Sequence, residues 1–158
     1  MTALQHAIAA QYPADANPYE TISDIFTNIG FLCPASTLAN LTVSKGYDVY
    51  RYYYNASFPN TTPLPDLGVW HSSEIPEVFG TYPTIGVTFQ QIELSKYMQA
   101  AWARFAKKGS PGWPKYKATG KTLADLGGNG DNGEYNIKPG MVDGNCGVYA
   151  PVIAVLGI

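Results

Sequence analysis

The chain has 158 residues, 46% of them hydrophobic and 13% aromatic, and it carries a formal net charge of −2. This composition is sufficient for a folded core and excludes a wholly disordered chain, and the 14% of charged residues provide no basic field that would attract nucleic acid. No stretch approaches the roughly 18 consecutive apolar residues of a membrane span. Because no repeat or change of composition divides residues 1–158, we expect one structural unit. From the charge and the lack of a long apolar run, we expect no nucleic-acid partner and no membrane span.

The N-terminal part of the chain is predicted to be helical. Apolar residues recur at helical spacing in residues 2–11, and a Tyr-Pro pair ends this pattern. A second helix is expected from about Asp24, where Thr21 or Ser23 can cap its first turn. Gly30 is expected to interrupt this second helix.

The middle of the chain changes from a helical pattern to strand and loop patterns. A third helix, over residues 35–44, is expected to end at Gly46, and residues 47–54 then alternate in the manner of a strand. The tyrosines of this strand could form a stacking platform for a ligand, but core packing is the favoured interpretation for Tyr50, Tyr52 and Tyr54. Three prolines indicate a surface loop over residues 55–67.

A single histidine follows that loop. His71 stands between Trp70 and Ser72 on an expected exposed turn, before a short helix predicted over residues 73–79. A histidine on a loop suits a general acid or base, but it needs a nucleophile to deprotonate and a carboxylate to orient it. The other histidine, His6, has no metal-ligating neighbours at suitable spacing and is assigned no role.

The second half of the chain is predicted to contain a long helix, a hairpin and a last helix. Thr88 and Gln91 have the spacing of a capping box, and an apolar stripe follows them. The stripe consists of Phe89, Ile92, Met98, Ala101, Trp102 and Phe105. Residues 122–126 are expected to form a strand, and the glycine-rich residues 127–133 a hairpin turn, since they lack the lysine of a phosphate loop. Residues 146–158 are apolar enough for a closing helix.

Three glycosylation acceptors and two cysteines indicate an exported protein. Each of Asn40, Asn55 and Asn60 begins an Asn-x-Ser/Thr sequon. Cys33 and Cys146 either form a disulfide, worth up to roughly 4 to 5 kcal/mol in the chain-entropy model, or remain two buried thiols. The first residues lack the basic start and apolar centre of a signal peptide. We therefore expect that an N-terminal part of the protein is missing from this sequence.

Five segments occur in a characteristic order along the chain. The first two, residues 24–34 and 49–54, precede the segment 68–80, which contains His71-Ser72-Ser73-Glu74 and ends in Val78-Phe79-Gly80. The last two, residues 98–109 and 113–116, contain Phe105-Ala106-Lys107 and Trp113-Pro114-Lys115-Tyr116. In this order the segments resemble the C-terminal portion of the type B carboxylesterase and lipase family, the cholinesterase-like α/β-hydrolases, and particularly its fungal secreted members.

The resemblance implies an α/β fold and a role for the histidine. Residues 1–158 would be a C-terminal fragment of a carboxylesterase type B domain, with the last central strand, the histidine loop, the long closing helix, a terminal hairpin and an incomplete sheet. His71 would be the triad histidine, with Trp70 and Glu74 as supporting members of its motif. Glu74 follows the histidine, whereas the triad acid of this fold precedes it, so Glu74 is interpreted as a residue that starts a helix.

Two further positions depend on the same resemblance. Cys33 and Cys146 match positions that the family bridges, which implies a disulfide between them. Ser72 stands where the family usually has glycine. If that glycine is needed for a positive φ, serine would strain the histidine loop.

The catalytic partners of the histidine are absent from this sequence. No Gly-x-Ser-x-Gly nucleophile motif occurs, and the glycine-rich oxyanion segment is missing too. We expect the C-terminal segment of an extracellular serine carboxylic-ester hydrolase, which supplies the histidine, uses no cofactor or metal, and is inactive alone. Ester or lipid substrates are expected only for the completed protein.

Two alternatives remain open. The first is a non-catalytic secreted binding protein derived from a hydrolase. The second is an intact esterase site in which Ser72 or Ser73 is the nucleophile for His71. The second alternative is disfavoured, because adjacent side chains on one loop leave little room for a substrate and oxyanion donors.

Overall fold

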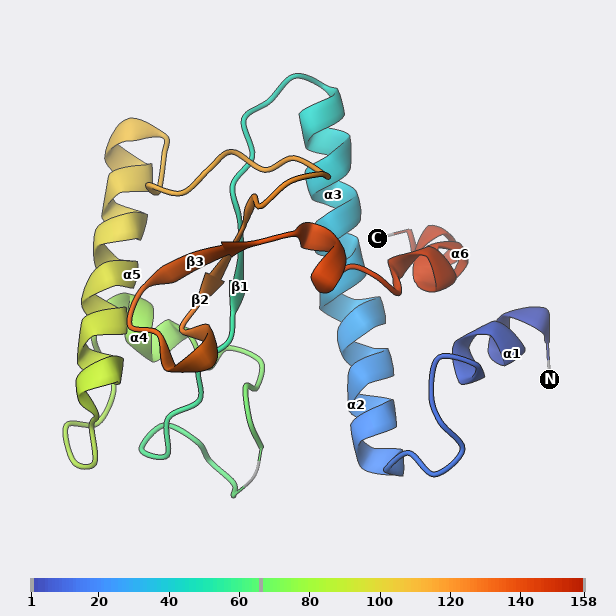
Figure 1. The fold of residues 1–158 in the computed structure, drawn as a ribbon, viewed down its shortest axis with the longest axis horizontal. Helices are drawn as coiled ribbons and strands as arrows, with labels where there is room; N and C mark the ends of the chain where they lie inside the picture. The colour runs from blue at the N-terminus through green and yellow to red at the C-terminus, as the bar shows by residue number, and fades with distance from the viewer. Residues whose placement is uncertain (1, 66, 158) are drawn as a thin grey trace. The chain divides into compact units, whose positions relative to one another are not determined.

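The computed structural model describes residues 2–65 and 67–157, which gather into two compact units (Figure 1). The first unit takes its described residues from 1–49, 117–119 and 138–158, and the second takes its described residues from 50–116 and 120–137. The predicted loop over residues 55–67 has no regular structure where it is described, and Asp66 lies outside the described residues. The assignment of the whole chain to one domain stays a prediction.

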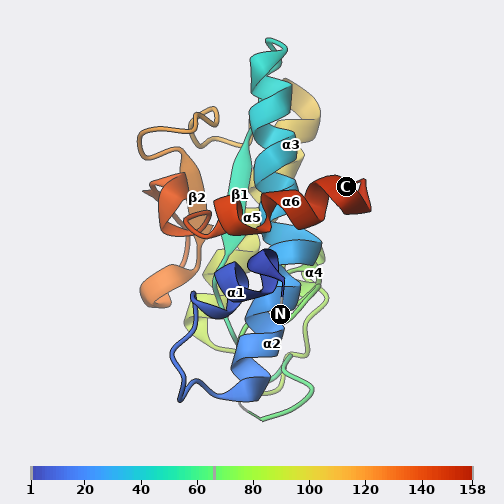
Figure 2. The same ribbon diagram turned by 90° about the vertical axis from the view of Figure 1, so that its right-hand side faces the viewer.

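Helices build the first unit. A continuous rod contains α2 (Pro18–Thr27), the π-helical turn η1 (Asn28–Leu32) and α3 (Cys33–Ser44), and α1 (Ala3–Ala9) precedes it. The short turn η3 (Pro139–Met141) leads to α6 (Cys146–Leu156), which packs on η1, α3 and α1 (Figures 1 and 2). The first, third and closing helices predicted from the sequence are confirmed by α1, α3 and α6.

The second helix begins earlier than the sequence predicts. The side chain of Asn17 accepts a 2.9 Å hydrogen bond from the backbone N–H of Tyr19, and Pro18 suits a first helical turn. The start predicted near Asp24 is therefore wrong, and the predicted capping residues lie inside the helix. The interruption predicted at Gly30 takes the form of the π-helical turn η1, which contains Gly30 and separates α2 from α3 without breaking the rod.

A disulfide lies at the centre of the first unit. Cys33, at the start of α3, is bonded to Cys146, at the start of α6, with 5.2 Å between their Cα atoms. Cys33, Tyr149 and Ile153 form the buried cluster of this unit. Such a small apolar cluster stabilises a fold only weakly, so the disulfide contributes a large part of what holds these helices together.

The second unit contains a three-stranded mixed sheet. β1 (Arg51–Tyr54) pairs in parallel with β2 (Leu123–Leu126), and β2 pairs antiparallel with β3 (Glu134–Ile137). The turn η2 (Gly128–Gly130) lies in the β2–β3 hairpin, as the glycine-rich segment predicts. The strand predicted over residues 47–54 is shorter than expected, since residues 47–50 are not paired in the sheet.

The long helix α5 (Phe89–Lys108) covers the core of the second unit. Thr88 caps it by accepting a 3.1 Å hydrogen bond from the backbone N–H of Gln91, and Gly109 ends it with a φ of 69°. α5 also packs against the short helix α4 (Ile75–Phe79). The buried cluster of the second unit includes three residues of α5 and consists of Ala56, Phe58, Leu94, Met98, Ala101, Trp113, Ala124 and Leu126.

The face that α5 buries differs from the predicted apolar stripe. Phe89 is 73% exposed and Phe105 is 52% exposed, so the ends of that stripe do not reach the core. The buried face consists of Gln91, Leu94, Ser95, Met98 and Ala101. The predicted capping box is only half formed, because the Gln91 side chain bonds to α4. In the described part of the chain, no helix is both long and apolar enough to cross a membrane.

Candidate active site

His71 lies on the turn that leads into α4, and its side chain is exposed. Two backbone hydrogen bonds fix this turn: the N–H of Ser73 donates to the carbonyl of Trp70 at 3.0 Å, and the N–H of Ile75 donates to the carbonyl of Ser72 at 3.2 Å. The turn therefore holds the imidazole at the surface, where a proton can be exchanged with a reacting group.

Ser72, next to the histidine, adopts a left-handed backbone conformation. Its φ is 73°, which L-residues rarely adopt because the Cβ atom crowds the backbone. The family to which the motif bears a resemblance usually has glycine here, and glycine adopts this conformation without strain. The strain considered from the sequence is therefore present in the turn.

The two serines beside His71 are poorly placed to act as nucleophiles. Ser73 is 5% exposed, and its hydroxyl is buried without a hydrogen-bond partner among the described residues. Ser72 is half-buried on the strained turn. A nucleophile must be open to its substrate and bonded to its base, and a buried Ser73 hydroxyl does not fit that requirement.

Glu74 starts α4 through its backbone. Its carbonyl accepts hydrogen bonds from the N–H groups of Glu77 and Val78 at 3.1 and 3.0 Å, and its side chain makes no capping bond. Its charge acts instead on the tyrosines of β1. Burial raises the pKa of Tyr52 and of Tyr54, the nearby Glu77 raises that of Tyr54 further, and Glu74 raises both.

A buried carboxylate behind the turn is a feature that the sequence analysis missed. Glu77 is 0% exposed, and its Oε1 accepts a 2.9 Å hydrogen bond from Nε2 of Gln91 on α5. Its backbone carbonyl accepts a 2.7 Å bond from the hydroxyl of Ser95. Burial raises the pKa of Glu77, and the hydrogen bond from Gln91 opposes that shift. The only sequence signal is an acidic residue in an otherwise apolar short helix.

A second buried acid lies at the β2–β3 hairpin. Asp125 accepts a hydrogen bond from the side chain of Asn55 at 3.4 Å, and burial raises its pKa while this bond lowers it. Gly128 is required beside it, because a Cβ atom there would lie 2.5 Å from Oδ1 of Asp125. No group of three or more His, Cys, Asp and Glu side chains within the described residues could hold a metal ion.

The predicted glycosylation acceptors differ in how accessible they are. Asn40, on α3, and Asn55, after β1, are exposed. Asn60 is half-buried, and its Nδ2 donates a 2.8 Å hydrogen bond to the carbonyl of Pro83. Nδ2 of Asn40 donates likewise to the carbonyl of Ser36 at 3.0 Å and Nδ2 of Asn55 to Asp125 at 3.4 Å, so the three acceptors differ in exposure rather than in having a bond at the attachment atom.

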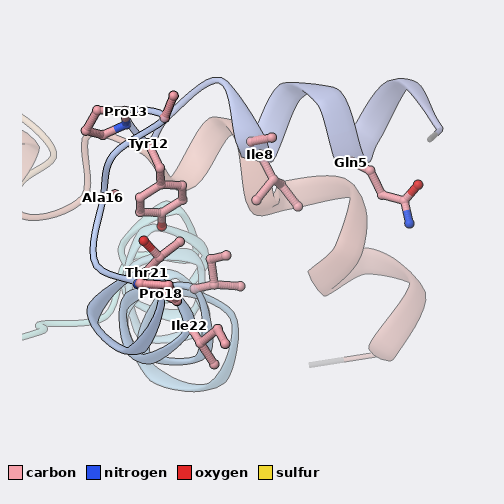
Figure 3. Close-up of a pocket in the computed structure, with 11 residues that line it drawn as sticks. Gln5, Ile8, Tyr12, Pro13, Ala16, Pro18, Thr21 and Ile22 are labelled. Carbon is pink, nitrogen blue, oxygen red and sulfur yellow. The ribbon is translucent and has the colours of Figure 1, made fainter.

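Two pockets lie away from the His71 turn. An open pocket of about 500 Å³ lies between α1, the following loop and α2, with Tyr12 pointing toward α2 (Figure 3). An aromatic pocket of about 190 Å³ in the second unit is lined by Tyr50, Tyr52, Trp102, Phe105, Pro111 and Trp113. Neither pocket is lined by His71 or Glu74.

Comparison with known proteins identifies similar sequences. The model described as "Carboxylesterase family" matches residues 2–138. The chain is 33% identical over 113 residues to secreted lipase 5 of Gibberella zeae, an alignment that covers 68% of this chain and 20% of the lipase. It is 37% identical over 110 residues to the chlorogenic acid esterase of Aspergillus niger, covering 68% of this chain and 19% of the esterase.

A third relative comes from an animal. The acetylcholinesterase of Bungarus fasciatus is 33% identical over 110 residues, covering 63% of this chain and 18% of that enzyme. The chain thus spans about one fifth of the length of the curated relatives it matches.

Proposed function

Because the chain belongs to the carboxylesterase family, we propose that it is the part of a secreted serine carboxylic-ester hydrolase that supplies the triad histidine, His71. The observation that carries the proposal is the exposed His71 on a turn fixed by backbone hydrogen bonds. In this role the imidazole accepts the proton of a serine nucleophile and then returns it to the departing alcohol. Carboxylic esters, including lipid esters, are the proposed substrates.

The proposal assigns the nucleophile and the acid to a part of the protein outside this sequence. The printed sequence has no Gly-x-Ser-x-Gly motif, and the chain matches only about one fifth of its relatives' length. In α/β-hydrolases the nucleophile and the acid both precede the histidine in chain order. We therefore infer that a preceding segment completes the site, and that the chain alone hydrolyses no ester.

Exposed apolar side chains on α2 support this incompleteness. Tyr19, Ile22 and Phe26 are 66%, 68% and 66% exposed, and their spacing places them along one side of the helix. Large exposed apolar patches are uncommon on isolated soluble proteins and often mark a surface that another part covers. The missing segment is the proposed cover.

An extracellular location is part of the same proposal. Disulfides persist mainly in oxidising compartments, and this chain joins Cys33 to Cys146. One of its fungal relatives is named a secreted lipase. Both observations support secretion of the parent protein, with Asn40 and Asn55 as the accessible acceptors for glycans.

A chimera tests the proposal. This chain replaces the matching segment of the Gibberella zeae lipase, and the purified, cooperatively melting protein is assayed with a nitrophenyl butyrate ester. We expect turnover that His71→Ala lowers by about 10⁴-fold or more. His6→Ala, at the chain's other histidine, is the matched control and leaves turnover unchanged. A folded but inactive chimera, or turnover that survives His71→Ala, contradicts the proposal.

One observation favours a second candidate function, a non-catalytic secreted binding protein. Tyr50, Tyr52 and Trp102 belong to the walls of the aromatic pocket of about 190 Å³, and Tyr52 and Trp102 meet edge to face. Such a surface suits a small apolar or aromatic ligand. Cooperative melting of the chain alone, with ligand binding that Tyr52→Ala removes, would favour this function over the esterase fragment.

A further inference from the structure

Polar side chains join the short helix α4 to the long helix α5 directly behind the histidine turn. Gln91 bonds to the carboxyl group of Glu77, and Ser95 bonds to its backbone carbonyl. Gln99 then donates a 3.0 Å hydrogen bond to the Ser95 hydroxyl. Gln91, Ser95 and Glu77 are all 0% exposed, so these groups are shielded from bulk solvent.

Two acceptor atoms between α4 and α5 lack a hydrogen-bond partner among the described residues. Oε2 of Glu77 and Oε1 of Gln91 are both buried, and neither has a hydrogen-bond partner among the described residues. An ionised carboxylate and an amide oxygen can only accept hydrogen bonds. With Glu77 ionised, a buried charge and a buried amide oxygen would both remain unsatisfied, which is costly in a site without a compensating cation.

We propose that Glu77 is held as a neutral carboxylic acid, whose Oε2–H donates to Oε1 of Gln91 while Nε2 of Gln91 donates to Oε1 of Glu77. A single proton turns one of the two unsatisfied acceptors into a donor for the other. The result is a reciprocal acid–amide pair in which both groups are satisfied. The direction of the Glu77 pKa, which burial raises, agrees with a retained proton.

This pair makes Glu77 a positioning residue for the His71 turn. Glu77 lies on α4, which follows the turn without a break and is too short to be stable alone. Its attachment to α5 therefore sets where the turn sits. This consequence rests on the proposed esterase function, whereas the acid–amide pair does not.

The groups around Glu77 determine the direction of its pH dependence. Tyr54 faces it from β1 and is also close to Glu74, while α5 presents the neutral Gln91 and Ser95. None of these is a cation that would favour the carboxylate. Because the folded-state pKa lies above the ordinary value of 4.5, the pair stabilises fully below pH 4.5. Its contribution is lost as the pH rises through the folded-state pKa.

Glu77→Gln tests the pair, because a second amide forms the same reciprocal bonds without a titrating proton. The urea midpoint of each protein is measured between about pH 5 and about pH 8. We expect the midpoint of the unmodified chain to fall with rising pH relative to that of Glu77→Gln. Other buried acids such as Asp125 titrate in both proteins, so only the difference between them is interpreted. If Glu77→Gln is less stable than the unmodified chain by the same amount at every pH, the proposal is overturned.

Glu74→Gln is the matched control, since Glu74 lies three residues earlier and is only half-buried. Its midpoint is expected to follow that of the unmodified chain across the same range. If Glu74→Gln removes the pH dependence and Glu77→Gln does not, the titrating group is wrongly assigned.

Infrared spectroscopy of the unmodified chain gives a direct test that does not depend on how the variant folds. With isotope-labelled glutamate, a protonated carboxyl stretch at neutral pH is expected, and it is absent from Glu77→Gln. Only carboxylate bands at neutral pH would overturn the pair. Neither measurement uses ester turnover, so the pair and the proposed function fail independently.

In an active chimera, the positioning role has a kinetic signature. At alkaline pH the unmodified chimera is expected to lose kcat/KM, because Glu77 gives up its proton and the acid–amide pair breaks. Glu77→Gln has no proton to lose at this position, so it is expected to retain kcat/KM. A kcat/KM profile that keeps its shape in Glu77→Gln would contradict the positioning role.

Discussion

Tyr149 and Tyr12, 137 residues apart in the chain, share a hydrogen bond of 2.7 Å between their hydroxyl oxygens. Tyr12 donates its own proton to Oδ2 of Asp24 at 2.6 Å, so Tyr149 is the donor to Tyr12. Tyr149 is 0% exposed, whereas Tyr12 lies at the wall of the open pocket (Figure 3). The relay connects α6 through Tyr12 to α2 within the first unit.

Replacing the two tyrosines is expected to give unequal effects. Tyr149→Phe removes one hydrogen bond and leaves no buried donor unsatisfied, so it costs about 1 kcal/mol in the free energy of unfolding. Tyr12→Phe leaves the buried Tyr149 hydroxyl without its acceptor and costs about 2 to 3 kcal/mol. Urea unfolding of both variants measures the difference. Equal losses, or a larger loss for Tyr149→Phe, would show that the relay does not run in this direction.

The disulfide is expected to be the largest single contribution to the first unit. Its cysteines are 113 residues apart, and a loop of that size gives roughly 4 to 5 kcal/mol in the chain-entropy model. The double variant Cys33→Ala, Cys146→Ala should lose about this amount in urea unfolding. A reducing agent should lower the midpoint of the unmodified chain similarly and leave the double variant unchanged. An unchanged midpoint in the double variant would refute the prediction.

Local signals in the sequence account for most of the elements but not for their buried faces. The cap at Thr88, the end at Gly109 and the hairpin turn over residues 127–133 are encoded by neighbouring residues, so they could be predicted. The sequence does not single out Asn17 as the cap, because Thr21 and Ser23 also carry side-chain oxygens that can cap a helix. The π-helical turn at Gly30 lies beside the disulfide, where Ile29 packs against the buried cluster, and local propensity does not report such packing.

The candidate site shows the same division. The His71 turn could be predicted, because a histidine, a serine replacing glycine and a following Pro-containing helix lie within a few residues. Glu77 could not be, since its burial and its bond to Gln91 join residues 14 apart on two helices. The predicted stripe on α5 is purely apolar, whereas the buried face includes Gln91 and Ser95 because α4 presents polar groups to it.

The hairpin turn provides a test of steric fit. A Cβ atom on Gly127 would lie 2.6 Å from Cβ of Ala56 and 2.7 Å from Cδ2 of Leu94, both in the buried cluster. Gly127→Ala is therefore expected to cost about 2 to 4 kcal/mol, from overpacking together with its φ of 78°. Gly130→Ala is the matched control, because Gly130 has a φ of 77° with nothing within 4 Å of its Cβ position.

The control isolates backbone strain from the clash. Gly130→Ala should cost only about 1 kcal/mol, the usual penalty for a left-handed L-residue. Thermal unfolding of both variants gives the comparison. If the two substitutions cost the same free energy of unfolding, then the side chains around Leu94 can shift to accommodate a methyl group, and the close contacts at Gly127 do not destabilise the variant.

The strained serine beside the histidine gives a prediction of the opposite sign. Ser72 has a φ of 73°, so Ser72→Gly relieves strain and is expected to stabilise the chain by about 1 kcal/mol, even after the entropic cost of glycine. Ser110→Gly is the control at a half-buried serine whose φ is not positive, and it should destabilise by about 0.5 to 1 kcal/mol. Urea midpoints compare the two variants with Ser72→Ala, which removes the hydroxyl but keeps the strain. Stabilisation by Ser72→Ala equal to that by Ser72→Gly would mean that the hydroxyl, and not the backbone, carries the cost.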